Sequence, residues 1–129
     1  MQEIYIKSSK AVVKVIAKET IISAIINDSF FYSYIPSVQV LNNVPKNIDA
    51  VIKVEDTTEN ILNINYPDIY YGYKKLNIKD IISLIEFIFE RARQEKGIIC
   101  IHGAGAIVNH KLIACWGTAT GMRKNNFSA

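Results

Sequence analysis

The feature that most constrains the fold of this chain is a long amphipathic helix predicted between Asn77 and Gly97. Its apolar residues recur at spacings of three and four, and they are Ile78, Ile81, Ile82, Ile85, Ile88 and Phe89. This spacing places them on one helix face, which has to be buried against other elements. Asn77 is a favoured N-cap residue, and Gly97 is a typical stop. Because Phe87 widens the apolar face, we expect this helix to pack between two layers.

The residues before this helix show the pattern of a small mixed α+β unit. Residues 3–7 and 11–17 alternate as the strands of a hairpin, and further strands are expected at 50–54, 61–66 and 69–73. A helix is expected at 21–31, with Thr20 as its N-cap and an end before Pro36. Four tyrosines fall in or beside the last two strands, and they are Tyr66, Tyr70, Tyr71 and Tyr73. They form either an aromatic patch or, as we favour, ordinary strand positions with buried rings.

Composition narrows the class of protein further. Half of the 129 residues are hydrophobic and the net charge is only +3, so a packed core is expected. The basic residues are scattered among acidic ones, which argues against a nucleic-acid-binding protein. No apolar run approaches the ~18 residues of a membrane span, and the start of the chain alternates instead of resembling a signal peptide. We therefore expect a cytoplasmic protein in which Cys100 and Cys115 are buried free thiols, a disulfide between them being the alternative.

The chain divides, on this pattern, into an α+β unit at 1–75 and a second unit at 76–129. In the second unit the long helix is followed by short strands at 98–101, 106–109 and 111–116, and then by a glycine-containing loop. The expected fold class is α+β, with α/β character toward the C-terminal end, where the first strands of a nucleotide-binding sheet are predicted.

The loop at 117–125 has the layout of a phosphate-binding P-loop, G-x-x-x-x-G-K-[ST]. When Lys124 takes the lysine position, Thr118, Arg123 and Asn125 fall on the two glycines and the Ser/Thr, so only the lysine matches. Gly117 is offset by one from the first glycine, and Gly121 is an internal glycine. The candidate nucleotide-binding residues are Gly117, Thr118, Thr120, Gly121, Arg123, Lys124 and Asn125.

The segment from Ile101-His102-Gly103 through the apolar hairpin to this loop resembles the start of the kinase domain of HPr kinase/phosphorylase and its smaller relatives. These kinases share a P-loop core with phosphoenolpyruvate carboxykinase. The resemblance covers only the part from the end of the predicted helix to Asn125. It implies ATP and Mg²⁺ as ligands and, for the full-length family, phosphoryl transfer to a protein serine or a small molecule.

The departures from the family pattern bear on activity. Arg123 adds bulk where a glycine lets the backbone approach the phosphates, and Asn125 replaces the hydroxyl that binds Mg²⁺. The family's downstream acidic residues have no counterpart after the loop. We therefore expect a truncated or degenerate, inactive form, with no catalytic residue assigned. His102, His110 and Cys115 match no recurrent metal site, and His102 is interpreted as a structural residue.

Two alternatives to a kinase-like protein stay open. The first is a non-enzymatic module that binds a protein or peptide partner or forms a homo-oligomer, because an incomplete sheet exposes edges and apolar surface. The other alternative is a shortened reading frame whose product has no selected function.

Overall fold

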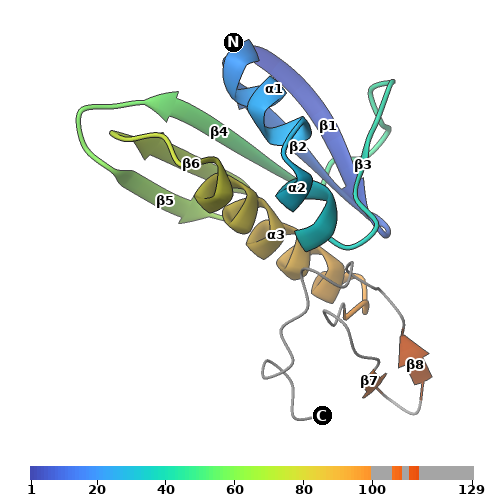
Figure 1. Ribbon diagram of the computed structural model, residues 1–129. Helices are drawn as coiled ribbons and strands as arrows, with labels where there is room; N and C mark the ends of the chain where they lie inside the picture. Colours follow the sequence, from blue (N-terminus) through green and yellow to red (C-terminus); the bar gives the residue numbers. More distant parts are fainter. Residues whose placement is uncertain (100–105, 109–110, 114–129) are drawn as a thin grey trace.

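The computed structural model describes residues 1–99, 106–108 and 111–113 of the chain (Figure 1). Its elements, in chain order, are β1 Gln2–Ser8, β2 Ala11–Ala17, α1 Glu19–Ile26, α2 Ser29–Tyr34, β3 Gln39–Val40, β4 Ala50–Asp56, β5 Ile61–Asn65, β6 Asp68–Tyr73, α3 Ile78–Glu95, β7 Ala106–Val108 and β8 Lys111–Ile113. The expected α+β class is confirmed at this level.

The first six strands form one mixed sheet in the order β3-β1-β2-β4-β6-β5. β1 is antiparallel to both of its neighbours, β2 and β3. The central strands β2, β4 and β6 are parallel to one another. β5 then turns back antiparallel to β6 and occupies one edge of the sheet. All five strands expected in residues 1–75 are therefore present, whereas the short edge strand β3 was not anticipated.

The helices lie on one face of this sheet, and the hydrophobic core fills the space between them (Figure 1). Alternate strand residues such as Ile6, Val13 and Ile52 point to this face and are fully buried. The apolar stripe of α3 meets them: five of its residues are buried, and they are Ile81, Ile82, Ile85, Ile88 and Phe89. This helix therefore shares one core with the strands of residues 1–75.

The expectation that α3 packs between two layers is wrong for the described residues. Phe87 is 50 % exposed, because it projects from the helix away from the sheet. The cap and the stop were predicted correctly. The Asn77 side chain accepts a hydrogen bond from Lys79 N at 3.1 Å, and Gly97 adopts a positive φ of 76°.

The single helix expected at 21–31 is in fact two helices, α1 and α2. Asp28 separates them, since its extended backbone and its side chain, which accepts from Phe30 N at 2.9 Å, start a new helix. Thr20 is not the N-cap of α1. Lys18 holds that position in an extended conformation, without a side-chain capping bond, and Thr20 lies in the first turn.

The hairpin expected near residue 110 is present as β7 and β8, paired from Ala106↔Ile113 to Val108↔Lys111 in a sheet of their own. The rest of the two predicted strands, residue 109 and residues 114–116, lies outside the described residues. Of the strand expected at 98–101, residues 98 and 99 are described and have no strand structure. The remainder of the predicted nucleotide-binding sheet lies outside the described residues.

Candidate functional site

The predicted phosphate loop lies outside the described residues, and so do the histidines and cysteines. Its candidate residues are Gly117, Thr118, Thr120, Gly121, Arg123, Lys124 and Asn125, and their placement stays a prediction. Within 1–99, no group of three or more His, Cys, Asp or Glu side chains is arranged to hold a metal ion. The described residues offer other candidate binding surfaces. The strongest of them is the exposed edge strand β5.

Every residue of β5 is exposed, including three large apolar ones. Ile61 is 44 % exposed, Leu62 53 % and Ile64 44 %. Among the described residues, β5 pairs with β6 alone, so the backbone groups on its other side lie at the edge of the described sheet. Such an edge is a template on which a further strand can pair.

Two of these apolar side chains lie on the face of the sheet that carries the core. Leu62 is opposite Tyr71 and Ile64 is opposite Ile69, and Ile69 in turn is opposite the buried Ile52 of β4. None of the helices in the described part of the chain covers this face at β5, because α3 packs across β2 and β4 in the middle of the sheet. The core face therefore runs out to the edge without a helix above its last strand.

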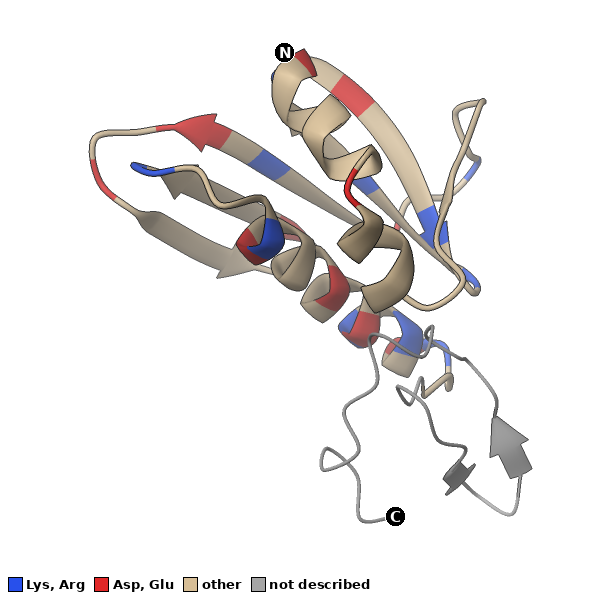
Figure 2. Cartoon of the chain, in the orientation of Figure 1, with Lys and Arg blue, Asp and Glu red and all other residues tan. Residues whose placement is uncertain are grey.

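The edge strand also lacks charge. Its sequence, Ile61-Leu62-Asn63-Ile64-Asn65, has no ionisable residue and no proline, and Figure 2 shows β5 without a red or blue segment. Natural edge strands are usually protected from pairing by lysines, prolines or bulges. β5 carries none of these devices, which marks it as a strand able to accept a partner.

The end of β5 is held by a contact with the helix. The guanidinium of Arg91 lies 4.4 Å from the ring centroid of Tyr66, the residue that follows β5. Burial and the neighbouring carboxylate of Glu95 raise the pKa of the Tyr66 hydroxyl to about 12. This stacked pair joins the turn between β5 and β6 to α3.

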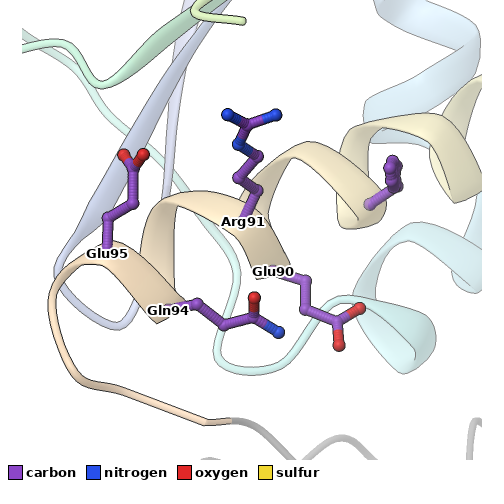
Figure 3. Close-up of a pocket in the computed structure, with 5 residues that line it drawn as sticks. Glu90, Arg91, Gln94 and Glu95 are labelled. Carbon is purple, nitrogen blue, oxygen red and sulfur yellow. The ribbon is translucent and has the colours of Figure 1, made fainter.

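A groove of about 520 Å³ runs along the C-terminal half of α3, and its lining includes Phe87, Glu90, Arg91, Gln94 and Glu95. Figure 3 shows Arg91 and Glu95 extending to one side of the helix and Glu90 and Gln94 to the other. The lining thus mixes two carboxylates with one guanidinium that already stacks on an aromatic ring. It converges on no single ligand chemistry.

Polar side chains also meet at the carboxyl ends of the parallel strands. Lys18, after β2, pairs with Asp56 at the end of β4. The bond from Lys18, followed by one from Tyr73, lowers the pKa of Asp56, and the same pairing with Asp56 raises the pKa of Lys18. Both side chains of the pair are half exposed, so we interpret it as a surface ion pair.

The tyrosines are distributed over both faces of the sheet and the turn before β6, and of the buried rings that the sequence interpretation favoured only that of Tyr73 is present, the other three being partly exposed. Tyr71 and Tyr73 lie on the core face with their ring centroids 6.4 Å apart. Tyr70 lies on the opposite face and donates to Glu55 Oε2 at 2.7 Å, whereas Tyr66 contacts Arg91.

A buried polar network lies at the other flank of α3. Arg93 is fully buried and donates to Glu86 Oε2 and to Ser8 Oγ, each at 2.6 Å. Ser8 in turn donates to the carbonyl oxygen of Pro36 at 2.5 Å. The network links α3, β1 and the segment after α2, and its role is structural.

Comparison of the chain with models of protein families, with curated proteins and with solved structures found no match. Among the described residues, none of the helices has the length and apolar character needed to cross a membrane. The sequence predicted the strand at 61–66 but not its edge position, for which its lack of charge was the available signal.

Proposed function

We propose that this domain is a protein-interaction module that binds another polypeptide as an added strand along β5. The observation that carries the proposal is the edge strand, which is exposed over its whole length, uncharged, and apolar at three of its five positions. In this mode of recognition, backbone hydrogen bonds supply affinity, and alternate side chains supply specificity.

The rest of the described fold supports this use of β5. The described residues already form one hydrophobic core, in which α1, α2 and α3 pack against β1, β2, β4 and β6. The Arg91–Tyr66 contact holds the hairpin that presents β5. A rigid scaffold with one open strand lowers the entropy lost on binding. Leu62 and Ile64 would then contact alternate side chains of the added strand on the core face.

Selection of short random peptides displayed on phage tests this function. The wild-type chain is the target, and a Leu62→Lys/Ile64→Lys variant, checked for folding by circular dichroism, is the counter-target. We expect peptides with alternating apolar residues that bind the wild type at least about tenfold more tightly than the variant, a difference of about 1.4 kcal/mol. Peptides that bind both proteins equally, or no enrichment at all, would reject β5 as the binding strand.

A second proposal is nucleotide binding by the loop at 117–125, as in the HPr-kinase-like proteins that the sequence resembles. It is supported by Lys124, by the two offset glycines and by the preceding hairpin, of which β7 and β8 are described. ATP and Mg²⁺ are the ligands implied, and the altered loop positions argue for binding without turnover.

Trp116 adjoins this loop and provides a direct readout. Titration of the chain with Mg·ATP should quench its fluorescence in a saturable manner, and a Lys124→Ala variant should respond more weakly. An unchanged signal at millimolar nucleotide would remove this second proposal while leaving the interaction module untouched.

A cytoplasmic location is also proposed. The alternating residues at the start of the chain, which argued against a signal peptide, form the strand β1 within the sheet. Fractionation of cells that produce the chain tests this location.

A further inference from the structure

We propose that the strand added to β5 is β5 of a second copy of this chain, paired antiparallel about a two-fold axis through Asn63. This inference rests on the proposed function and names its partner. An isologous contact of this kind requires one surface patch that is complementary to itself. β5 meets that requirement in its register, in its apolar pattern and in its lack of charge.

Register is restricted by the faces of the sheet. Directly opposite residues in an antiparallel pair point to the same face, so the core-face residues Leu62 and Ile64 have to oppose core-face residues of the copy. An axis between two neighbouring residues would place a core-face residue opposite an outer-face residue. The two-fold axis therefore has to pass through a residue. Only an axis through Asn63 pairs all five residues of β5 with the five of its copy.

With this axis, Leu62 of each copy opposes Ile64 of the other on the core face. The register of the described sheet already aligns Ile52, Ile69 and Ile64 in one row across β4, β6 and β5. In the dimer this row continues into the second copy through its Leu62 and Tyr71. The pairing therefore brings Leu62 and Ile64 of the two copies side by side and reduces their exposure.

Charge does not oppose the pairing. Because β5 holds no ionised side chain, self-pairing places no like charges opposite each other. On the outer face Asn63 would oppose its own copy, and Ile61 would oppose Asn65.

A five-residue strand makes a small interface, below the ~1,200 Å² of standard complexes, so we expect a dissociation constant on the order of 100 µM.

The first test is the oligomeric state of the full chain, measured by size exclusion with light scattering over about a hundredfold range of concentration. The wild type should approach the mass of a dimer at the upper end. Leu62→Lys should remain a monomer. Val44→Lys, the same change at a more exposed apolar residue in a loop, is the matched control and should dimerise like the wild type.

A compensating pair of substitutions tests the register. In Leu62→Lys/Ile64→Glu, each lysine opposes a glutamate of the other copy only when the axis passes through Asn63. This variant should dimerise again, and the dimer should weaken as salt is added. Leu62→Lys/Ile64→Lys, which opposes like charges, should stay monomeric.

Several outcomes would overturn the proposal. They are a wild type that stays monomeric throughout, a dimer that Leu62→Lys leaves intact, and a Lys/Glu variant that does not recover. A monomeric wild type that still selects peptides through β5 would reject the second copy as partner while retaining the interaction module. A chain that neither dimerises nor selects peptides through β5 would reject the interaction module as well.

Discussion

Arg91 of α3 stacks on Tyr66, with its guanidinium 4.4 Å from the ring centroid, and this contact joins α3 to the turn of the hairpin that presents β5. β6 of this hairpin also contributes Ile69 and Tyr73 to the core that the helices cover, whereas β5 contributes no buried residue. The pairing of β6 with β4 sets the position of the hairpin in the sheet, and the Arg91–Tyr66 contact adds a link from its turn to α3. The contributions of Tyr66 and of other named residues to stability can be measured in solution.

The stability of the fold should fall on the alkaline side because of Tyr66. Burial raises the pKa of its hydroxyl from 10.0 to about 12 in the folded chain. The protonated hydroxyl therefore makes its full contribution to the free energy of unfolding below pH 10.0. This contribution is lost as the pH rises toward 12. Urea unfolding at a series of pH values should show a shallower alkaline decline in Tyr66→Phe. Tyr32→Phe, at an exposed ring, is the control and should decline as the wild type does.

The buried pair of Arg93 and Glu86 should be sensitive to removal of either member. Arg93→Ala leaves a buried carboxylate without its guanidinium, and we expect the free energy of unfolding to fall by about 3–5 kcal/mol. Glu86→Ala should act similarly, and the double variant should lose less than the sum of the two. Denaturant unfolding measures all three, with Glu90→Ala on the exposed face of α3 as control. Additive losses would show that the two side chains are not coupled.

The N-cap of α3 should contribute measurably to stability. Asn77 accepts hydrogen bonds from Lys79 N at 3.1 Å and Asp80 N at 3.4 Å. Asn77→Ala removes the acceptor and should lower the free energy of unfolding by about 1 kcal/mol. Asn77→Asp keeps an acceptor oxygen and should stay close to the wild type in the same thermal or denaturant measurement. Equal losses in both variants would contradict a capping role.

Gly72 of β6 should be intolerant of a larger residue. A Cβ at this position would lie 2.6 Å from Thr57 Cγ2 and 2.8 Å from Thr57 Oγ1. Gly72→Ala should therefore destabilise the fold by about 1–3 kcal/mol. Thr57→Ala removes both crowding atoms, so the double variant should lose less than the two single losses combined. A double-mutant cycle by urea unfolding decides the matter, and strict additivity would refute the clash.

Local patterns predicted most elements of the described fold. The alternation in β1 and β2 and the stripe of α3 with its Asn77 cap identify these elements because each pattern is set within a few residues. The break between α1 and α2 was missed, since Asp28 competes with a continuous helical pattern by capping a new helix. β3 was missed because a strand of two residues, Gln39–Val40, has no period of its own.

The candidate site was harder to predict than the fold. Leu62 and Ile64 form an exposed apolar pair only because β5 is placed at the edge of the sheet and α3 does not reach it. Both facts follow from the strand order, which depends on contacts between distant residues. The absence of charge in β5 could be read directly, but its meaning depended on that order. The phosphate loop at 117–125 stays a prediction from sequence.

The most direct test of the account is disulfide trapping at the proposed two-fold axis. In a Cys100→Ser/Cys115→Ser background, Asn63→Cys would place one thiol opposite its own copy, at the spacing of opposite residues in a sheet, ~4.5–5.5 Å between Cβ atoms. Asn65→Cys would instead oppose Ile61. Mild oxidation followed by non-reducing electrophoresis should yield a linked dimer from Asn63→Cys and much less from Asn65→Cys. Equal linking in both variants, or none in either, would contradict pairing of β5 about Asn63.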